Sequence, residues 1–559
     1  MMNFFEVSKE IANRLTSIFL RDGKGKRAVY GGTDKFQSDT ALARLSSILR
    51  VFPRRQRRRP RRQPSDRLDG LGREDDRALR QARSAKVSSG RKTRGACRRK
   101  NGKVKERSFS SRSVFTGCIL SWFLVVGVFV LTGCVFHDVR AQQSKMETFC
   151  RIDGSVSAGQ VTPGPLLVGL VRHNGGTLED PQNWSLVDHF VLESAGRWMF
   201  RAGPGTYGLV AFVDLNADGV YQPGEPFMPV DTNELVTCDS RHTHSELALF
   251  ITAEGRSRIE GEIDFMKFQA RTASAQLNQS LGAMTAYGVV TTFEDPRFRE
   301  EHATNSLWRP YDFIFDVGPG VYFLEPYDAH KIPVLFVHGI NGTPTNFRYL
   351  VEHLDRTKYQ PWLYYYPSGV RLSGIADHLD QTMKALQLQH GFMQYHVIAH
   401  SMGGLVSRGF LLRNQSGQSR PRVPLYITIS TPWAGHKAAE TGVNYAPAVV
   451  YVWNDMAPQS AYLTDLFFSN HNGVRAHRPL PAGVEHHLLF GYKHRGTLPG
   501  ECSDSTVTLA SQLYAGAQED ANRLYGFDET HMSILESMET SRLVNRLLND
   551  AFALRGKPN

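Results

Sequence analysis

Ser401 is the residue whose setting points most directly to chemistry. It stands in residues 397–406, V-I-A-H-S-M-G-G-L-V, where a short apolar run passes through one corner residue into a helical pattern. A serine on such a corner presents its hydroxyl oxygen outward, as a nucleophile must. Ala399 and Gly403, two residues before and after it, are small enough to let a strand and a helix approach closely. We therefore predict that Ser401 is a catalytic nucleophile rather than a buried serine at a helix start.

A serine nucleophile needs a base and an acid, and both follow in the chain. Asp504 lies in a loop of small residues, S-D-S-T-V, and His531 lies just before the last predicted helix. In such a set the histidine takes the serine proton and the carboxylate fixes the imidazole tautomer. The weaker candidates are Asp520 and Asp528 for the acid and His486, His487 and His494 for the base.

Two further segments extend the pattern. Residues 332–342, I-P-V-L-F-V-H-G-I-N-G, read as a hydrophobic strand that runs into a His-Gly turn, and residues 427–432 read I-T-I-S-T-P. With the order Ser, Asp, His, these features resemble the α/β-hydrolase superfamily, and within it the lipase and esterase branch. The resemblance covers residues 326–555. It implies that the backbone amides of Ile340 and Met402 form the oxyanion hole, while His338 orders the loop.

Strands and helices alternate from residue 332 onward. Parallel strands need helical crossovers, so a doubly wound, mostly parallel sheet with helices on both faces follows. The predicted strands are 332–338, 359–366, 394–399, 423–429, 485–491 and 521–527, and the predicted helices are 344–354, 372–390, 402–414 and 532–553.

An aromatic-rich insertion, residues 432–481, interrupts this alternation. At this point of a lipase-like fold an insertion forms a cap over the site, which is the reading that its position favours. The spacing of its apolar residues is equally consistent with a helix packed on the core: Tyr462, Leu463, Leu466 and Phe467.

The region before the sheet has a different pattern. Residues 149–252 contain short apolar runs separated by Gly, Pro and Asn, which predicts a small antiparallel β-sandwich. We assign residues 253–325 as a connecting region in which 308–315 and 318–323 suggest strands, the latter adding the first, antiparallel strands to the hydrolase sheet. Residues 141–148 have the composition of a polar stalk.

An acidic loop lies within the predicted sandwich. Asp214, Asn216, Asp218 and Glu225 occupy positions 1, 3, 5 and 12 with Gly at position 6, the spacing with which such a loop wraps calcium. The alternative is a turn in which the carboxylates accept hydrogen bonds from backbone amides. A structural role is expected in either case.

The charge of the chain is concentrated at one end. Residues 1–112 hold 32 Lys and Arg against 11 Asp and Glu, so the rest of the chain is mildly acidic. The arginine-rich run 53–62 could bind nucleic acid or anionic lipid, but like-charge blocks are usually solvated tails, and we predict no nucleic-acid partner. The leader is either disordered or precedes the true start of translation, near Val104 or Val114.

An apolar segment, residues 113–134, ends in L-T-G-C. It resembles a bacterial lipoprotein signal in which Cys134 is acylated, and the alternative is an ordinary transmembrane helix. Either reading tethers the chain to a membrane with its larger part outside the cytoplasm. Cys150 and Cys238 bracket the predicted sandwich and could be bridged in an oxidising compartment, leaving Cys502 free. The sequence leaves that pairing open.

These observations predict a membrane-tethered serine hydrolase that cleaves lipid or other acyl esters. The same triad would serve an acyltransferase, in which an alcohol replaces water. A third hypothesis is a non-catalytic surface protein that retains the fold for binding. The chain carries no H-E-x-x-H, paired C-x-x-C or Walker motif, so we expect no cofactor in catalysis and at most a structural calcium ion.

Overall fold

The computed structural model describes residues 135–159, 163–178, 180–239, 243–252, 261–266, 280–413, 421–471, 474–494 and 502–554. The basic leader, the apolar segment and Cys134 lie outside these residues. Among the helices in the described ranges, none combines the length and apolar character needed to cross a bilayer. Lipidation and membrane tethering therefore stay predictions.

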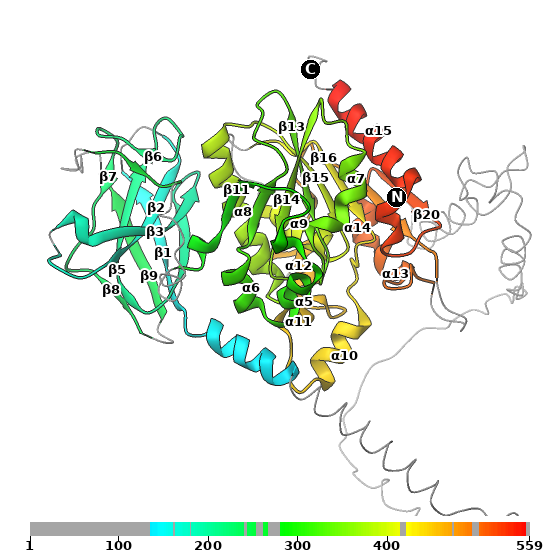
Figure 1. Cartoon of the computed structure of the whole chain (residues 1–559), viewed down its shortest axis with the longest axis horizontal. Helices are drawn as coiled ribbons and strands as arrows, with labels where there is room; N and C mark the ends of the chain where they lie inside the picture. The colour runs from blue at the N-terminus through cyan, green and yellow to red at the C-terminus, as the bar shows by residue number, and fades with distance from the viewer. Residues whose placement is uncertain are drawn as a thin grey trace, which may run out of the picture. The chain divides into compact units, whose positions relative to one another are not determined.

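A mixed eight-stranded sheet organises the C-terminal part of the chain (Figure 1). Its strands, in spatial order, are β11 (Ala286–Val290), β12 (Gly320–Phe323), β14 (Tyr359–Tyr365), β13 (Ile332–Val337), β15 (His396–His400), β16 (Leu425–Ile429), β19 (Glu485–Gly491) and β20 (Arg523–Phe527). All neighbours run parallel except β12 and β14. The predicted doubly wound, mostly parallel sheet is confirmed.

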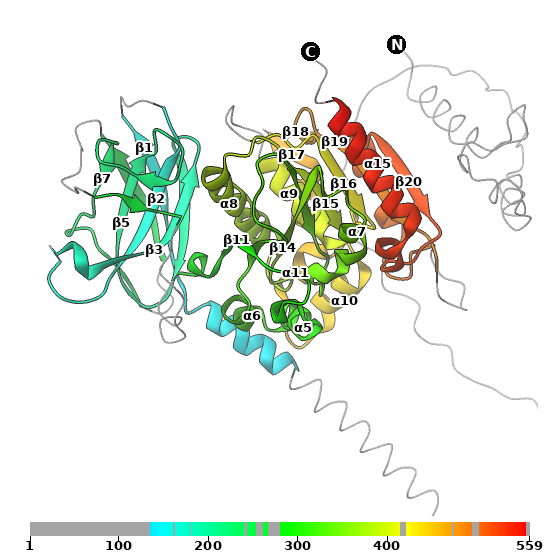
Figure 2. The ribbon, with the colours of Figure 1, turned by 45° about the horizontal axis from the view of Figure 1, so that its top comes forward.

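Helices cover both faces of this sheet. Successive side chains of a strand point to opposite faces. Leu335 and Val337 accordingly pack in one core with α8 (Leu372–His390) and α9 (Met402–Arg413), while Val334 and Phe336 pack in a second core with α7 (Arg348–Glu352) and α15 (Met538–Leu554). Figure 2 shows α8 and α15 on opposite sides of the strands. The predicted strands and helices of this part agree with the structure to within a few residues, although short 3-10 helices open two of them: η6 (Pro344–Phe347) and η7 (Ser533–Glu536).

From Ala286 onward, the segment assigned as a connecting region belongs to the sheet domain, whereas its residues 263–264 pair with residues 220–221 of the preceding part of the chain. β11 and β12 come from it, and β12 lies antiparallel to β14 as predicted. The predicted strand at 308–315 is wrong, because helices α5 (Glu300–Trp308) and α6 (Pro310–Asp316) occupy this segment. Pro310 opens α6, where its missing N–H costs no intrahelical hydrogen bond.

The predicted polar stalk is also wrong. Residues 135–146 form a helix. Its Gln142 donates to Asp312 over 2.9 Å and its Lys145 forms a 3.2 Å ion pair with the same carboxylate. Arg140 and Gln143 donate to carbonyl groups of residues 447 and 449 at 2.6 and 2.8 Å. These tertiary contacts explain why a polar segment folds here.

The preceding part of the chain is a β-sandwich with two sheets. One has the order β4-β1-β9 and the other β3-β2-β5-β7, with β8 on β5. The strands are β1 (Cys150–Ala158), β2 (Leu166–His173), β3 (Trp184–Leu192), β4 (Gly196–Ala202), β5 (Gly205–Val213), β7 (Phe227–Met228), β8 (Val236–Cys238) and β9 (Thr243–Ile251), beside a small pair of β6 (Val220–Tyr221) and β10 (Ile263–Asp264). The prediction of a wholly antiparallel sandwich is wrong in one pairing, since β9 returns to lie parallel to β1.

A disulfide joins the two sheets of the sandwich. Cys150 on β1 is bonded to Cys238 on β8 with their Cα atoms 5.6 Å apart, and Cys502 is free and exposed. The bond closes a loop with a sequence separation of 88, so it removes much conformational entropy from the unfolded chain. We expect Cys150→Ala/Cys238→Ala to lower the free energy of unfolding by about 2–5 kcal/mol. Urea denaturation measures this loss, and Cys502→Ala, the matched control, should stay within about 0.5 kcal/mol of the parent.

The acidic loop of the sandwich is closed by its own amides. Asp214 is buried and accepts backbone hydrogen bonds at 2.8 and 3.2 Å, and Glu225 accepts two at 2.7 and 2.9 Å. Asp218 accepts one from the backbone, at 2.8 Å, and two from side chains, Asn216 at 2.8 Å and Gln222 at 2.9 Å. In the described ranges no three His, Cys, Asp or Glu side chains are placed to hold a metal ion. This arrangement fits the hydrogen-bonded turn, and calcium binding stays a prediction.

The two readings of this loop differ in their response to chelation. We expect EDTA to leave the thermal unfolding midpoint unchanged, because backbone amides already satisfy the carboxylates. Asp214→Ala should destabilise the fold by about 1–3 kcal/mol for each amide left buried without an acceptor. A midpoint that falls on chelation and recovers with added calcium would favour the metal instead. Differential scanning calorimetry measures both changes.

The insertion 432–481 divides into an exposed and a buried part. It forms α10 (Lys437–Tyr445), α11 (Tyr451–Met456), α12 (Ala461–Phe467) and a hairpin of β17 (Phe468–His471) and β18 (Val474–His477). In both ribbon views α10 and α11 lie with α5 and α6 at one end of the sheet (Figure 1). Tyr445 at the end of α10 is 81% exposed. By contrast Leu463, Leu466 and Phe467 of α12 are buried, which confirms the core-packing reading for that helix.

Arg408 attaches α12 and the hairpin to α9. Its side chain is fully buried, donates to the carbonyl groups of Leu466 and Arg478 at 2.9 Å each, and forms a 2.5 Å ion pair with Asp520 at the end of α14 (Ala515–Asp520). The guanidinium also lies 4.1 Å above the ring of Phe467. Removing one member of such a pair leaves a buried charge without its partner.

We therefore expect Arg408→Ala to lower the free energy of unfolding by about 3–5 kcal/mol. Arg542→Ala, an exposed arginine on α15, is the control and should change it by less than about 0.5 kcal/mol. Arg408→Met/Asp520→Leu should recover most of the loss, because neither charge then remains buried. Chemical denaturation compares the three variants, and a mild effect of Arg408→Ala would contradict the role assigned to the ion pair.

Candidate active site

Ser401 occupies the turn between β15 and α9 in a backbone conformation that few residues adopt. Its φ is 54°, and its N–H donates to the carbonyl of Ile429 at 2.8 Å. The space around it requires small neighbours. A Cβ on Gly339 would lie 2.7 Å from the Cβ of Ser401, and a Cβ on Gly403 would lie 2.2 Å from the carbonyl oxygen of Val337. The glycines therefore allow the strained corner predicted from the sequence.

The structure brings the three predicted side chains together. Ser401 Oγ lies 2.9 Å from His531 Nε2, and His531 Nδ1 lies 2.8 Å from Asp504 Oδ2. The backbone N–H of His531 also donates to the carbonyl of Asp504 at 2.8 Å. All three residues are buried, with 4%, 7% and 0% of Ser401, His531 and Asp504 exposed. This is the geometry in which an imidazole can accept a proton from the hydroxyl while the carboxylate holds the other ring nitrogen.

Asp504 is held in its charged form. Burial by itself would raise its pKa, but the hydrogen bond and charge of His531 and the amides of Val507 and Thr506 lower the pKa below the usual 3.8. Those amides donate to Asp504 Oδ1 at 2.7 and 3.0 Å, leaving Oδ2 for His531. A carboxylate accepting several hydrogen bonds stays ionised, so it can stabilise the imidazolium.

Two other histidines support the site without joining the proton path. His400 Nε2 contacts the carbonyl of His531 at 2.9 Å, and burial lowers the pKa of His400 to about 3. His338 contacts the carbonyl of Gly339 at 2.7 Å and stacks on Tyr366 with ring centroids 4.2 Å apart, and burial lowers its pKa to about 4. Both rings are neutral at physiological pH, and His338 orders the turn after β13.

The predicted oxyanion donors lie beside Ser401. Val337 is paired with Ala399 in the sheet, so the turn that follows β13 lies level with the corner that follows β15. Met402 opens α9, where its N–H has no intrahelical acceptor. Among the described residues we find no protein acceptor for the amides of Ile340 or Met402. A substrate carbonyl oxygen would find two free donors there.

The competing candidates are engaged elsewhere. Asp520 pairs with Arg408, and His486 contacts Thr428 Oγ1 at 2.9 Å. His494 contacts Ser503 beside the acid loop, and none of these histidines contacts Ser401. Two residues that contact the turn after β13 were not predicted from the sequence. Tyr366 donates to the carbonyl of His338, and Ser368 Oγ accepts from the backbone N–H of Asn341 at 3.1 Å.

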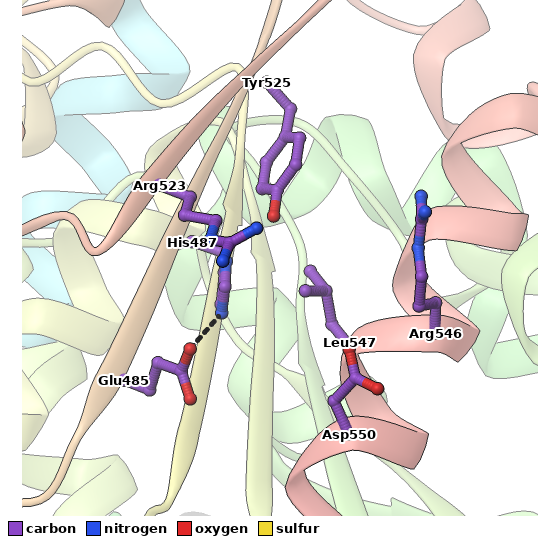
Figure 3. A pocket seen from close by; sticks show the side chains of 7 residues that line it. All are labelled: Glu485, His487, Arg523, Tyr525, Arg546, Leu547 and Asp550. Carbon is purple, nitrogen blue, oxygen red and sulfur yellow. Dashed lines mark hydrogen bonds and ion pairs between the residues drawn. The ribbon is translucent and has the colours of Figure 1, made fainter. Parts of the chain in front are cut away.

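His487 lies in a separate polar pocket of about 190 Å3 (Figure 3). Its Nε2 contacts Glu485 at 3.0 Å, and Arg523 and Tyr525 line the same pocket. Glu485 and Arg523 begin their strands, whereas Ser401 follows the carboxyl end of its own. Strands β19 and β20 run parallel to β15, to which β16 connects them. The pocket therefore lies at the amino ends of the strands, and Ser401 lies at their carboxyl ends.

Comparison with known proteins agrees with this topology. A family model described as "Alpha/beta hydrolase of unknown function (DUF915)" matches residues 371–471. No curated protein matches the chain. The solved structures similar to it include the mature form of lipase BlEst2 from Bacillus licheniformis, at 18% identity over 41% of this chain and 97% of that one, with a TM-score of 0.32.

Two esterases show likenesses of the same order. A putative aryl esterase from Burkholderia cenocepacia is 13% identical, with coverage of 42% of this chain and 96% of that one and a TM-score of 0.30. A carboxylesterase structure from Nitrososphaera gargenis is 12% identical, with coverage of 42% and 96% and a TM-score of 0.28. Strand order, the serine corner and the family match together show that residues 286–554 have the α/β-hydrolase fold.

Proposed function

We propose that the chain is a serine hydrolase that cleaves carboxylic esters. The observation that carries the proposal is the continuous chain of hydrogen bonds from Ser401 through His531 to Asp504. The names of the similar structures, a lipase and two esterases, favour an ester substrate over an amide.

The geometry assigns one role to each group. As Ser401 Oγ attacks the acyl carbonyl, His531 Nε2 takes the hydroxyl proton, and the amides of Ile340 and Met402 stabilise the negative charge on the carbonyl oxygen. The imidazolium returns the proton to the departing alkoxide, which leaves as an alcohol. Water then attacks the acyl-enzyme with His531 as base, releasing the carboxylic acid and restoring Ser401. An acyltransferase would differ only in using an alcohol at this last step.

Fluorophosphonate labelling followed by mass-spectrometric location of the adduct tests the proposal. An activated serine should form an adduct on Ser401 that is absent in His531→Ala. Ser407→Ala, a buried serine on α9 that donates to the carbonyl of Gly403, is the control and should label normally. An adduct located elsewhere, or none in the presence and absence of detergent, would favour the non-catalytic binding protein. Product analysis with water and an alcohol as competing acceptors separates hydrolase from acyltransferase.

We also propose that the enzyme acts outside the cytoplasm, tethered through Cys134. The Cys150–Cys238 disulfide supports an oxidising compartment. Metabolic labelling with a radioactive fatty acid should mark the chain and lose that mark in Cys134→Ser. Retention of the label in that variant, or no label in the parent, would contradict lipidation.

A further inference from the structure

The described part of the chain contains a cavity of about 550 Å3. Its walls come from β3 and β4 of the sandwich, from α8, from the helix at 135–146, and from Tyr451 at the start of α11. Neither Ser401, Asp504 nor His531 lines it. Its volume lies in the range of about 300–1,000 Å3 that is typical of small-molecule sites.

The side chains around this cavity are largely apolar. Phe190 and Met199 line it from the sandwich, and Val370 lines it from the segment before α8. Met146, Leu281 and Ile314 line it as well and belong to one hydrophobic cluster. Met199 is 38% exposed, so it is available to a ligand rather than consumed by packing. Apolar surface of this kind gains free energy when an apolar ligand removes it from water.

Most charged side chains that line the cavity interact with other groups of the protein. Arg371 forms two contacts with Asp455, at 2.7 and 3.0 Å, and Asp377 is paired with Arg413. Glu147 shares a hydrogen bond with Tyr451. These groups have partners in the protein and are not free to bind a ligand charge.

Asp188 carries less charge than a carboxylate normally would. It is buried, and it accepts hydrogen bonds from Ser280 Oγ and, at 2.8 Å, from the amide of His189. Burial raises its pKa to about 7, despite those hydrogen bonds, which favours the neutral acid more than in an exposed carboxylate. Burial also lowers the pKa values of His189 and His378 to about 4, which leaves both rings neutral.

Arg201 on β4 differs from these charged residues in its pairing. Among the described residues no carboxylate forms an ion pair with its guanidinium, and Arg201 is one of the residues that line the cavity. The carboxylate that acts on it electrostatically, Asp153, already has its two oxygens engaged by Arg151 at 2.7 Å and Arg197 at 3.3 Å. Three arginines thus share one carboxylate, and Arg201 is the one of them that lines the cavity.

We propose that this cavity binds a single-chain amphiphilic carboxylate, such as a long-chain fatty acid. The apolar lining takes the hydrocarbon chain, and Arg201 takes the carboxylate through charge-assisted hydrogen bonds. Ser401 takes no part in this site, so the test of ligand binding is independent of the test of the proposed esterase activity.

Gly374 provides a sharp test because it lines the cavity and a Cβ built on it meets no atom within 4 Å. It lies in α8 without a positive φ, so a larger side chain is tolerated by the backbone and favours the helix. We expect Gly374→Phe to fill the cavity and weaken palmitate binding at least 10-fold while the thermal unfolding midpoint is retained. Isothermal titration calorimetry on the full chain carrying Ser401→Ala, which prevents turnover, measures the affinity.

The control for bulk is Gly261→Phe, another glycine where a Cβ meets open space, and it should bind palmitate normally. Arg201→Gln should weaken palmitate binding about 10-fold or more and leave hexadecanol unaffected, whereas Arg197→Gln on the same strand should change neither. Unchanged palmitate binding in Gly374→Phe would overturn the cavity assignment and place the ligand elsewhere, including the substrate site. Equal affinities for palmitate and hexadecanol would overturn the role of Arg201.

Discussion

Ser401→Ala should reduce kcat for ester hydrolysis about a million-fold while leaving the protein folded. The loss is this large because the variant has no oxygen to form the acyl-enzyme, and only binding and oxyanion stabilisation remain. Alanine can keep the backbone of this corner, where φ is 54°, because the exchange removes only the hydroxyl oxygen, so the fold should be retained. Turnover of a chromogenic ester, with circular dichroism as the check of folding, measures both.

The interaction between Ser401 and His531 predicts that their contributions do not add. His531→Ala should cost about as much as Ser401→Ala, and the double variant should be no worse than either. If the losses of kcat in the two single variants multiplied in the double variant, the two residues would act independently. That result would contradict a joint role for the pair, whose side chains lie 2.9 Å apart. Retention of a tenth or more of the activity in Ser401→Ala would assign the nucleophile to another residue.

Asp504→Asn should reduce kcat about 10,000-fold, a smaller loss than that expected for Ser401→Ala. In the parent, Nδ1–H of His531 donates to Asp504, which leaves Nε2 as the acceptor that faces Ser401. An asparagine that keeps its two backbone hydrogen bonds presents an NH2 group to Nδ1 and so favours the opposite tautomer, in which Nε2 carries the proton and cannot accept another. Asp528→Asn, the exposed competitor for the acid role, is the matched control and should retain full activity.

The ionisation of Asp504 should also make the free energy of unfolding depend on pH in the acid range. Its pKa in the folded chain lies below its value in the unfolded chain. Its ionisation therefore stabilises the fold above the ordinary carboxylate pKa near 3.8, and that contribution is lost as pH falls through the lower, folded-state pKa. Asp504→Asn should remove this part of the pH dependence, as measured by urea unfolding between pH 3 and pH 7. An unaltered pH profile would contradict the ionised, hydrogen-bonded state assigned here.

The strands and helices of the sheet domain followed from local patterns with few errors. Buried parallel strands such as Ile332–Val337 are continuous apolar runs, and α8 repeats its apolar residues at helical spacing, so each element is specified by neighbouring residues. Residues 308–315 were wrongly predicted as a strand because aromatic residues are common in strands. Burial of Phe313 and Ile314 against the core selects the helix α6 instead.

The sequence by itself determined the corner at Ser401, the order of the three site residues and the two cysteines able to bridge the sandwich. These depend on spacing and residue type within short windows. Only the tertiary structure decided that His531, 130 positions from Ser401, places its ring 2.9 Å from the hydroxyl, and that Asp504 rather than Asp520 completes the set. It also decided that Arg408 is buried against Asp520 while Arg201 lines a cavity. The physical reason is that distances, burial and the pairing of charges are set by segments far apart in the chain, which no local pattern encodes.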